Sequence, residues 1–184
     1  YGIPQTRKRF DCIGTLKKFS KFVFPKETHT NNPEQIKNLK PWVTCKEVIG
    51  EFDSVLNGEK HNIPGGKHKE LFKSIPPGDN YLFYTKKRGC KNPKFEWKSR
   101  YWTFLLKLSP DRPSWTIQAS ISENQGPFHW NNRFLRISEI KRLQTIDDNY
   151  NLVGNHKEQW KQVGNAFPTM MAEIIAREIK NIFK

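Results

Sequence analysis

Turn-forming residues interrupt the chain at short intervals throughout residues 25–128. They stand at Pro25, Asn31-Asn32-Pro33, Asn57-Gly58, Pro64-Gly65-Gly66 and Pro76-Pro77-Gly78-Asp79-Asn80. The segments that they separate, such as residues 42–49 and 102–108, are short. Because short runs bounded by Gly, Pro and Asn are typical of strands joined by loops, we expect residues 25–128 to form a small, irregular strand-and-loop domain.

The flanking segments carry more regular patterns. The alternation over residues 10–14 predicts a short strand near the start of the chain. Residues 129–184 are expected to be helical, with Ser138 placed to cap a run that carries Ile140 and Leu143 on one face. A polar loop over residues 149–155 follows that run.

The stretch Gln162-Val163-Gly164-Asn165-Ala166-Phe167-Pro168 leads into a final apolar-striped run. Its Gly-Asn pair predicts a turn, and Pro168 fits the first turn of a helix, where a missing N–H costs nothing. The apolar positions that follow recur at helical spacing: Met170, Met171, Ile174, Ile175, Ile179, Ile182 and Phe183. The stretch is either an ordinary loop-to-helix junction or a turn whose N–H groups bind a carboxylate or phosphate.

The charge balance is strongly basic. Lys and Arg number 32 against 18 Asp and Glu, which gives a formal net charge of +14. Because a basic surface gains affinity by releasing counterions from a phosphate backbone, this excess predicts a polyanionic partner. The six Trp and 13 Phe indicate a folded basic protein, since a disordered basic tail would be poor in aromatic residues.

The cysteines and the hydropathy pattern exclude several classes. Cys12, Cys45 and Cys90 are scattered, which matches neither a metal site nor a disulfide framework and favours a reducing compartment. No apolar run approaches the length of a membrane span, and no signal peptide is visible. Because the chain begins at Tyr1, it is either a piece of a longer product or a processed one.

Two groups of residues are candidates for contact with a polyanion. Arg7 and Arg9 lie two apart, so an extended segment would place both on one side, as a solvated edge or as a clamp for phosphate or a base edge. Residues 81–102 interleave basic and aromatic side chains, a combination that suits nucleic acid, although we expect most of the rings to be core. The run Lys86-Lys87-Arg88-Gly89 is the best candidate for an exposed DNA-facing loop.

Three separated motifs occur in order around a variable stretch of about a hundred residues. They are Pro4-Gln5-Thr6-Arg7-Lys8-Arg9, the block from Arg133-Phe134-Leu135 through Glu139 to Arg142-Leu143-Gln144, and Gly164-Asn165-Ala166-Phe167-Pro168. They resemble the Q-x-R-x-R, R-x-L-x-x-x-E-x-x-R-L-Q and G-N-[AS]-x-P motifs of the DNA cytosine-5 methyltransferases. The segment Pro113-Ser114-Trp115-Thr116-Ile117-Gln118-Ala119 is similar to the family's T-[LIV] segment.

The resemblance implies an α/β fold: the C-terminal part of a Rossmann-like, S-adenosylmethionine-dependent methyltransferase with a small mixed α+β target-recognition domain. Residues 1–24 would end the catalytic domain, residues 25–128 would be the target-recognition domain, and residues 129–184 would return to the catalytic domain. The last helix would pack back on the catalytic sheet.

Other motifs of the family do not occur in this sequence. They are the F-x-G-x-G cofactor fingerprint, the Pro-Cys nucleophile and Glu-Asn-Val, and none of the three cysteines follows a Pro. We therefore expect the C-terminal half of such an enzyme, inactive without an N-terminal half in the same gene or a separate subunit. Two departures concern the second motif: Arg136 replaces the usual Thr or Ser of a capping box, so that Ser138 would cap instead, and Ile146-Asp147 replaces an aromatic-Pro pair.

The resemblance also implies roles for the residues. Arg9 would donate to O2 of an extruded cytosine and to the family's catalytic Glu, and Arg7 would hold the active-site loop or a phosphate. Gln5 and Thr116 would lie on the DNA side, Thr116 at a phosphate. Sequence readout would fall to the middle domain, including Lys86, Lys87, Arg88 and Arg100.

The cofactor implied is S-adenosylmethionine, bound through Gly164, Asn165 and Ala166. Asn165 and the backbone N–H of Ala166 would face its methionine carboxylate. The partners would be double-stranded DNA and the N-terminal half, in a restriction-modification system of the bacterial cytoplasm and nucleoid. Two alternatives stay open: a stand-alone, non-catalytic DNA-binding module, and an RNA-binding protein, which fits the charge but none of the motifs.

Overall fold

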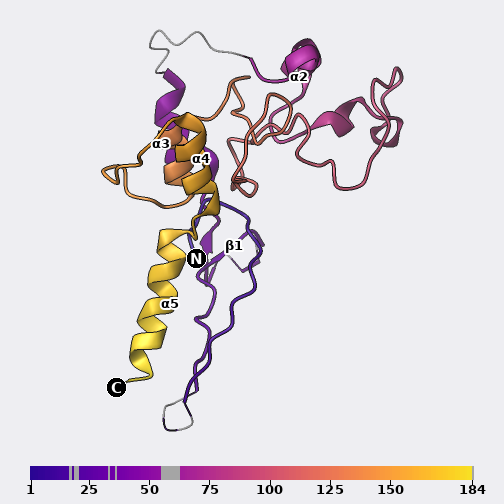
Figure 1. Cartoon of the computed structure of the whole chain (residues 1–184). Coiled ribbons are helices and arrows are strands. Elements are labelled where there is room, and N and C mark those ends of the chain that lie inside the picture. Colours follow the sequence, from indigo (N-terminus) through magenta and orange to yellow (C-terminus); the bar gives the residue numbers. More distant parts are fainter. Residues whose placement is uncertain (17, 19–20, 33, 36, 55–62, 184) are drawn as a thin grey trace.

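The computed structural model describes residues 1–183 except residues 17, 19–20, 33, 36 and 55–62. The strands and α-helices of the described residues are β1 (His29–Thr30), β2 (Lys40–Pro41), α1 (Cys45–Ile49), α2 (Lys69–Ser74), α3 (Ile137–Leu143), α4 (His156–Asn165) and α5 (Thr169–Asn181). Short 3-10 helices lie at Gly50–Ser54, Gly66–His68, Tyr81–Tyr84 and Lys86–Arg88. Long irregular segments connect these elements (Figure 1).

The strand content is low. β1 and β2 pair in parallel over two residues each, and this pair is the one sheet within the described residues. Isolated bridges, such as Phe104 with Gln125 and Lys107 with Phe128, hold the irregular segments together. The middle of the chain is therefore rich in loops, as expected, but side-chain packing replaces most of the expected strands. The Rossmann-like sheet stays a prediction.

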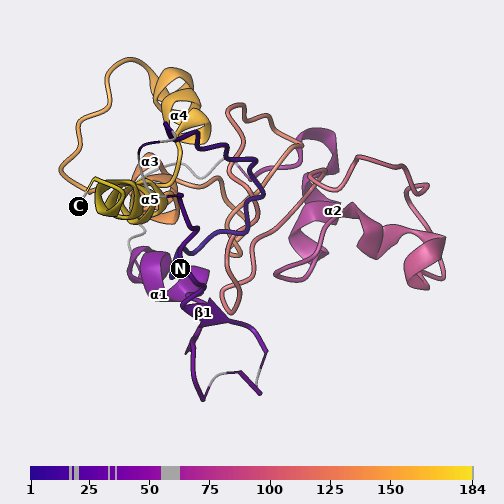
Figure 2. The same ribbon diagram turned by 90° about the horizontal axis from the view of Figure 1, so that it is seen from below.

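The first hydrophobic core lies where α1, α3 and α4 meet (Figure 2). Its buried residues are Cys45, Ile49, Leu108, Ile117, Trp130, Leu135, Ile140, Leu143, Trp160 and Val163. Trp160 anchors α4, because its ring fills the core while its indole N–H donates to the carbonyl of Gln118 at 2.8 Å. Since α1 belongs to this core, part of the region 25–128 packs with the C-terminal helices.

The second core is largely aromatic and lies around α2. Its buried residues are Phe72, Ile75, Tyr81, Leu105 and Phe128. Phe72 and Phe128 meet edge to face with ring centroids 5.2 Å apart, an arrangement that places a positive ring edge against a negative ring face. Four aromatic residues of the interleaved stretch stay exposed instead: Phe83, Trp97, Tyr101 and Trp102.

A lysine is buried against the second core. The side chain of Lys107 is 1% exposed, and its Nζ donates to Oδ1 of Asn132 at 2.7 Å and to the carbonyl of Ile75. The ammonium also lies 4.7 Å from the centroid of the Phe72 ring. Burial lowers the pKa of Lys107 from 10.5 to about 8.

Because of Lys107, the free energy of unfolding is expected to increase as the pH rises from 8 to 10.5. In this window the unfolded chain holds the Lys107 proton more tightly than the folded chain, so stability rises with pH. Lys107→Met should remove this increase, and urea titrations across the window measure it. Lys69→Met, at an exposed lysine, is the control and should keep it. Parallel pH profiles of the wild type and Lys107→Met would contradict the prediction.

Residues 42–49, which were grouped with the strand-like segments, form helix α1 from Cys45 onward. Thr44 and Glu47 build a capping box: Oγ1 of Thr44 accepts the N–H of Glu47 at 3.3 Å, and the Glu47 carboxylate accepts the N–H of Thr44 at 2.6 Å. The strand interpretation is wrong because the T-x-x-E spacing satisfies the first N–H groups of a helix. That signal was readable in the sequence.

Residues 10–16 and α5 extend away from both cores (Figure 1). Residues 10–14 are all described and form no strand, and Phe10 is 92% exposed. The predicted strand is wrong because a strand needs a neighbour for its backbone N–H and C=O groups, and none pairs with it within the described residues.

Helix α5 carries the predicted apolar stripe, and Pro168 is its N-cap residue. No residue of this helix, which is described throughout, is buried. Ile175 and Ile179 line a hollow of about 360 Å³ that they share with Cys12 and Ile13. The stripe is therefore only partly covered by the described chain.

Gly164 and Asn165 form the last turn of α4. The prediction of a Gly-Asn turn is therefore wrong, and the chain changes direction at residues 166–168 instead. A Cβ atom on Gly164 would lie 2.3 Å from the carbonyl oxygen of Gln118 and 2.6 Å from Cα of Ala119. The glycine is needed for the close approach of α4 to this backbone.

Gly164→Ala is expected to lower the free energy of unfolding by roughly 1–3 kcal/mol, because the added methyl group forces two backbones apart. The loss opposes the helix propensity of Ala, which favours Ala over Gly by about 1 kcal/mol. Urea unfolding measures it. Gly50→Ala is the control, since Gly50 is also helical and its nearest neighbours are Lys46 side-chain atoms. A Gly164→Ala chain as stable as the wild type would contradict the packing role.

Candidate active site

A pocket of about 360 Å³ opens between the start of the chain, residues 42–43 and the start of α5. Gln5, Arg7 and Arg9, the three residues that define the first motif, all line it. Further lining residues include Thr6, Trp42, Pro113, Phe167, Pro168 and Met171. The structure thus brings the first and third motifs to one cavity.

The first motif is clamped to the T-[LIV] segment. Gln5 and Ser114 form a parallel bridge, in which the N–H of Ser114 donates to the carbonyl of Pro4 at 2.9 Å and the N–H of Thr6 donates to the carbonyl of Ser114 at 2.8 Å. The hydroxyl of Thr116 donates to the carbonyl of Thr6 at 3.0 Å. These bonds fix the segment that carries Thr116 against one wall of the pocket.

The two arginines of the motif have different surroundings. Arg7 donates from Nη1 to the carbonyl of Ile117 and from Nη2 to the carbonyl of Gly164, both at 3.1 Å. Arg9 is exposed and lines the pocket. The two guanidiniums, which were expected on one side of an extended segment, thus differ in their contacts: Arg7 joins the first motif to the third, and Arg9 is presented to solvent.

Gln5 is buried beneath the pocket. It is 8% exposed, and its Nε2 donates to the carbonyl of Leu143 at 3.3 Å. Its Oε1 has no hydrogen-bond partner within the described residues, and neither has Nε of Arg7. Both motif side chains thus hold the fold together and still carry an unpaired polar atom.

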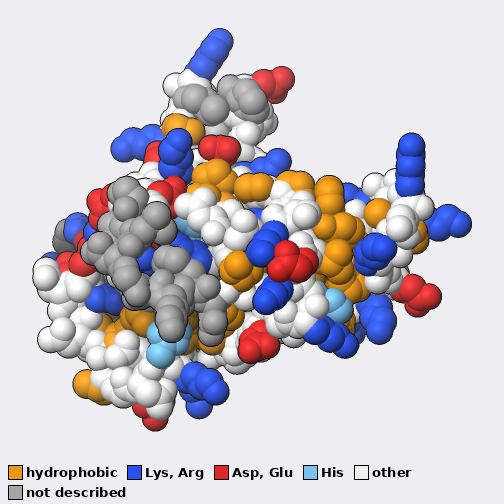
Figure 3. Space-filling view, turned by 90° about the horizontal axis from the view of Figure 1, so that it is seen from above, with side chains coloured by type: hydrophobic (Ala, Val, Ile, Leu, Met, Phe, Trp, Pro, Cys, Tyr) orange, Lys and Arg blue, Asp and Glu red, His pale blue; other side chains and the backbone are white. Residues whose placement is uncertain are grey.

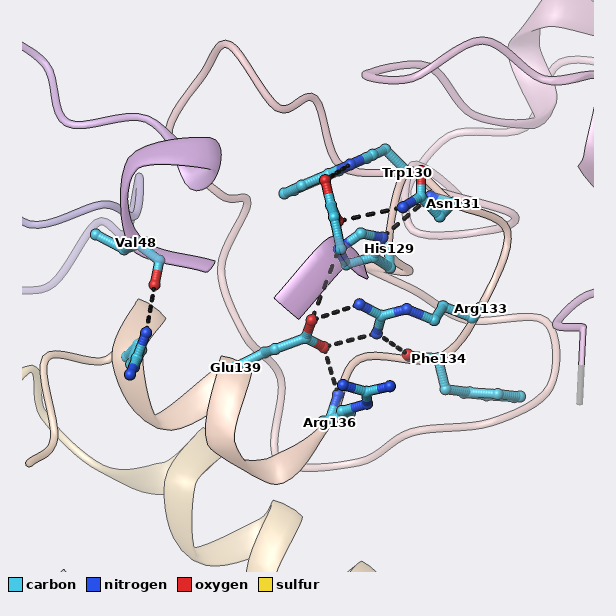
Figure 4. Close-up of polar contacts among 10 residues, drawn as sticks. Val48, His129, Trp130, Asn131, Arg133, Phe134, Arg136 and Glu139 are labelled. Atoms are coloured by element: carbon cyan, nitrogen blue, oxygen red, sulfur yellow. Dashed lines mark hydrogen bonds and ion pairs between the residues drawn. The ribbon is translucent and has the colours of Figure 1, made fainter. Parts of the chain in front are cut away.

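The second motif forms a buried ion pair. Arg133 donates to both carboxylate oxygens of Glu139, from Nη1 at 2.8 Å and from Nη2 at 2.6 Å (Figure 4). The same carboxylate accepts the N–H of Arg136, the N-cap residue of α3, at 2.7 Å. Ser138 lies inside the helix, so its predicted role as the cap is wrong, because Glu139 already satisfies the N–H at the helix start.

His129 and Asp53 extend this network. Nδ1 of the fully buried His129 accepts the N–H of Asn131 at 3.0 Å, and its Nε2 lies 3.2 Å from Oδ1 of Asp53 (Figure 4). Burial lowers the pKa of His129 to about 3, and the charges of Arg133 and Arg136 act in the same direction. The imidazole is neutral at physiological pH and has a structural role. Sequence reasoning missed both residues, since no motif contains them.

The end of the second motif ties three helices together. Nε2 of Gln144 donates to the carbonyl of Val163 in α4 at 2.9 Å, and the carbonyl of Gln144 accepts the N–H of Thr169 in α5 at 3.3 Å. Arg142 donates from Nε and Nη2 to the carboxylate of Asp148, at distances of 2.6–3.1 Å. The α4–α5 junction is therefore braced by α3.

The third motif offers few free N–H groups. The N–H of Ala166, expected to face a carboxylate, donates to the carbonyl of Gln162 at 3.1 Å. The N–H of Met170, at the start of α5, donates to the hydroxyl of Thr145 at 3.0 Å. Asn165 is exposed, so its side-chain amide is the polar group that this motif presents to solvent.

The basic run of residues 86–88 is exposed. Lys86, Lys87 and Arg88 form a single 3-10 turn. Arg88 pairs with Asp79 at 2.8 Å, and the Lys87 ammonium lies 4.4 Å from the centroid of the Trp97 ring. Figure 3 shows basic and hydrophobic side chains next to each other on one face of the molecule.

A second hollow adjoins the pocket. Its volume is about 750 Å³, and Thr6, Trp42 and Pro113 line both cavities. Arg112 and Trp115 line the second hollow but not the first pocket. The first pocket therefore opens toward a larger groove with aromatic and basic walls.

The cysteines supply no activated thiolate at the pocket. Cys45 is fully buried, and burial raises its pKa to about 12, so the thiol stays protonated. Cys12 and Cys90 do not line the pocket in the described structure. The described residues contain no cluster of His, Cys, Asp and Glu that could hold a metal ion. No described helix has both the length and the apolar character of a bilayer span.

Residues 1–181 match the family of C-5 cytosine-specific DNA methylases, and the chain belongs to this family.

Individual members of the family are similar to the chain over nearly its whole length. The type II methyltransferase M.SacI of Streptomyces achromogenes is 36% identical, over 97% of this chain and 48% of M.SacI. M.BspRI of Lysinibacillus sphaericus is 28% identical over 97% of this chain and 40% of its own length. M.BbvI of Brevibacillus brevis is 30% identical over 100% of this chain and 46% of its own. The chain thus spans about half the length of these curated relatives.

Proposed function

We propose that this chain is the C-terminal portion of a type II DNA cytosine-5 methyltransferase from a restriction-modification system. The complete enzyme would transfer a methyl group from S-adenosylmethionine to C5 of a cytosine extruded from a specific duplex site, in the bacterial cytoplasm and on nucleoid DNA. The observation that carries this proposal is the pocket where the first and third motifs meet, lined by Arg9 and braced by the second motif.

Arg9 is the proposed contact to the extruded base. A thiolate that adds to C6 of cytosine places negative charge on the ring, and a fixed cation near O2 stabilises that charge. Arg9 is exposed in the pocket and available for this role. Arg7 is a positioning residue, because its guanidinium is already bonded to the carbonyls of Ile117 and Gly164.

S-adenosylmethionine supplies the methyl group when it is bound. Of the three residues assigned to it, Asn165 fits best, since its exposed amide can donate to the methionine carboxylate. Gly164 allows α4 to approach the Gln118 backbone and so positions Asn165. Ala166 would contribute only local shape, because its N–H is engaged inside the chain.

The DNA side of the proposal rests on the exposed basic residues. Lys86, Lys87, Arg88 and Arg100 are all exposed and can contact phosphates or base edges. Thr116 donates its hydroxyl to Thr6, so it is assigned to hold the wall of the pocket beside the DNA backbone.

An N-terminal half is the proposed partner for three reasons that concern different parts of the molecule. Buried polar atoms of Gln5, Arg7 and Gln144 lack hydrogen-bond partners within the described chain, which is uncommon for a finished interior. The apolar stripe of α5 is not buried. The sequence also contains no Pro-Cys nucleophile. A domain that packs against α5 and the first motif would answer all three.

The test is reconstitution. The purified chain, mixed with duplex DNA and methyl-labelled S-adenosylmethionine, is expected to transfer no methyl group alone. It should become active when a separately expressed N-terminal half of a relative, carrying Pro-Cys, is added, and that half alone is the control. Methyl transfer by the chain alone would contradict the proposal. DNA binding without methyl transfer in every mixture would favour a non-catalytic binding module.

A further inference from the structure

Two tryptophan rings form an exposed pair beside the pocket. The rings of Trp102 and Trp115 have centroids 5.4 Å apart and planes inclined by 40°. They remain 39% and 46% exposed, respectively. The two rings contact each other, and much of the indole surface still faces water.

Local structure fixes this pair relative to the pocket. Trp115 lies between Ser114, which is fully buried and bridged to Gln5, and Thr116, which donates to Thr6. Its side chain points away from the buried side of the segment into the groove of about 750 Å³. Trp115 therefore lines the groove that adjoins the pocket of Arg9, and Trp102 supports it through the ring contact.

The surroundings of the pair suit a nucleic acid strand. Arg112 lines the same groove and is exposed, and Trp42 forms part of its wall and is 38% exposed. Asp111 is a carboxylate in the described lining, so the groove is not uniformly basic. Flat rings beside a guanidinium offer a stacking surface for bases and a contact for phosphate, whatever the base sequence.

We propose that Trp115, supported by Trp102, stacks on a nucleobase at the mouth of the pocket, next to the cytosine that enters it. The inference rests on the proposed function and extends it, since it assigns to the T-[LIV] segment a residue that contacts a base directly. A strand whose base reaches Arg9 would pass through the adjoining groove, which Trp115 lines.

The experiment uses the whole chain and two labelled duplexes of the same sequence. One duplex is fully paired, and the other carries a single abasic residue, which opens the base stack and leaves the phosphates unchanged. The wild type is expected to prefer the abasic duplex. Trp115→Ala should weaken binding of the abasic duplex roughly 5- to 100-fold, the range that one base–aromatic stack supplies. The salt dependence of the Kd should stay the same.

Two further variants separate stacking from folding. Trp115→Phe keeps a ring and should retain most of the preference for the abasic duplex. Tyr150→Ala, at a 61% exposed ring outside the described lining of both cavities, should retain it fully. A Trp115→Ala chain that binds both duplexes like the wild type would overturn the inference. An equal loss of affinity for both duplexes, with a weaker salt dependence of the Kd, would also overturn it. A wild-type chain that binds neither duplex would overturn the inference, whereas the proposed function is tested separately, by methyl transfer in the reconstituted mixture.

Discussion

Replacing Glu139 with Gln is expected to lower the free energy of unfolding by roughly 3–5 kcal/mol, the cost of breaking a buried ion pair on one side. The carboxylate is fully buried and the Arg133 side chain is 7% exposed, so the guanidinium would be left without its counter-charge in a region that water does not reach. The loss should be large because the pair lies beside the first core and at the start of α3. Urea unfolding monitored by circular dichroism measures it.

Glu158 provides a matched control. Its carboxylate accepts the N–H of Asn155 at 2.7 Å, the same distance and the same capping geometry that Glu139 offers to Arg136. Glu158 is exposed, and the described contacts include no ion pair that involves its carboxylate. Glu158→Gln should therefore cost about 1 kcal/mol or less, as expected for a weakened cap. Equal losses in the two variants would show that capping, and not the buried pair, carries the effect of Glu139.

Replacing Arg9 with Ala in the reconstituted enzyme is expected to lower the rate of methyl transfer about 10²–10³-fold, the usual effect of removing one group that stabilises developing charge. The affinity for duplex DNA should change little, because Arg9 lines the pocket and one phosphate contact among many contributes modestly. Single-turnover transfer of labelled methyl groups gives the rate, and a filter-binding titration gives the Kd.

Lys8→Ala is the control for Arg9. Lys8 is an exposed cation next to Arg9 in sequence, and it does not line the pocket in the described structure. It should change neither the rate nor the Kd appreciably. If Arg9→Ala weakens DNA binding as strongly as it slows transfer, Arg9 is a phosphate contact and its assignment to the extruded cytosine fails.

The C-terminal region shows how far sequence patterns reach. The helical stripe after Pro168 correctly predicted α5, since its spacing is a local property of the chain. The T-x-x-E signal of Thr44 and Glu47 was equally local but was overlooked among the turn-formers around it. Gly164 was assigned to a turn because a glycine has the same appearance in sequence whether it turns the chain or admits a close neighbour.

The candidate site shows what sequence patterns could not predict. The motif around Arg7 and Arg9 marked both residues, yet only their neighbours decided that Arg7 is bonded and Arg9 is exposed. The acceptors of Arg7, at Ile117 and Gly164, lie 110 and 157 residues away along the chain. No periodicity or propensity over a short window can report such partners.

By itself, the sequence determined the family, the basic character and the order of the three motifs, because these depend on residue identity and spacing alone. Only the tertiary structure decided which polar groups are already hydrogen-bonded. The N–H of Ala166 and the guanidinium of Arg7 donate within the chain. Arg9 and the side-chain amide of Asn165 are exposed. The reason is physical. A hydrogen bond inside a fold is made with whatever segment packs against the group, and that segment is set by the burial of both cores.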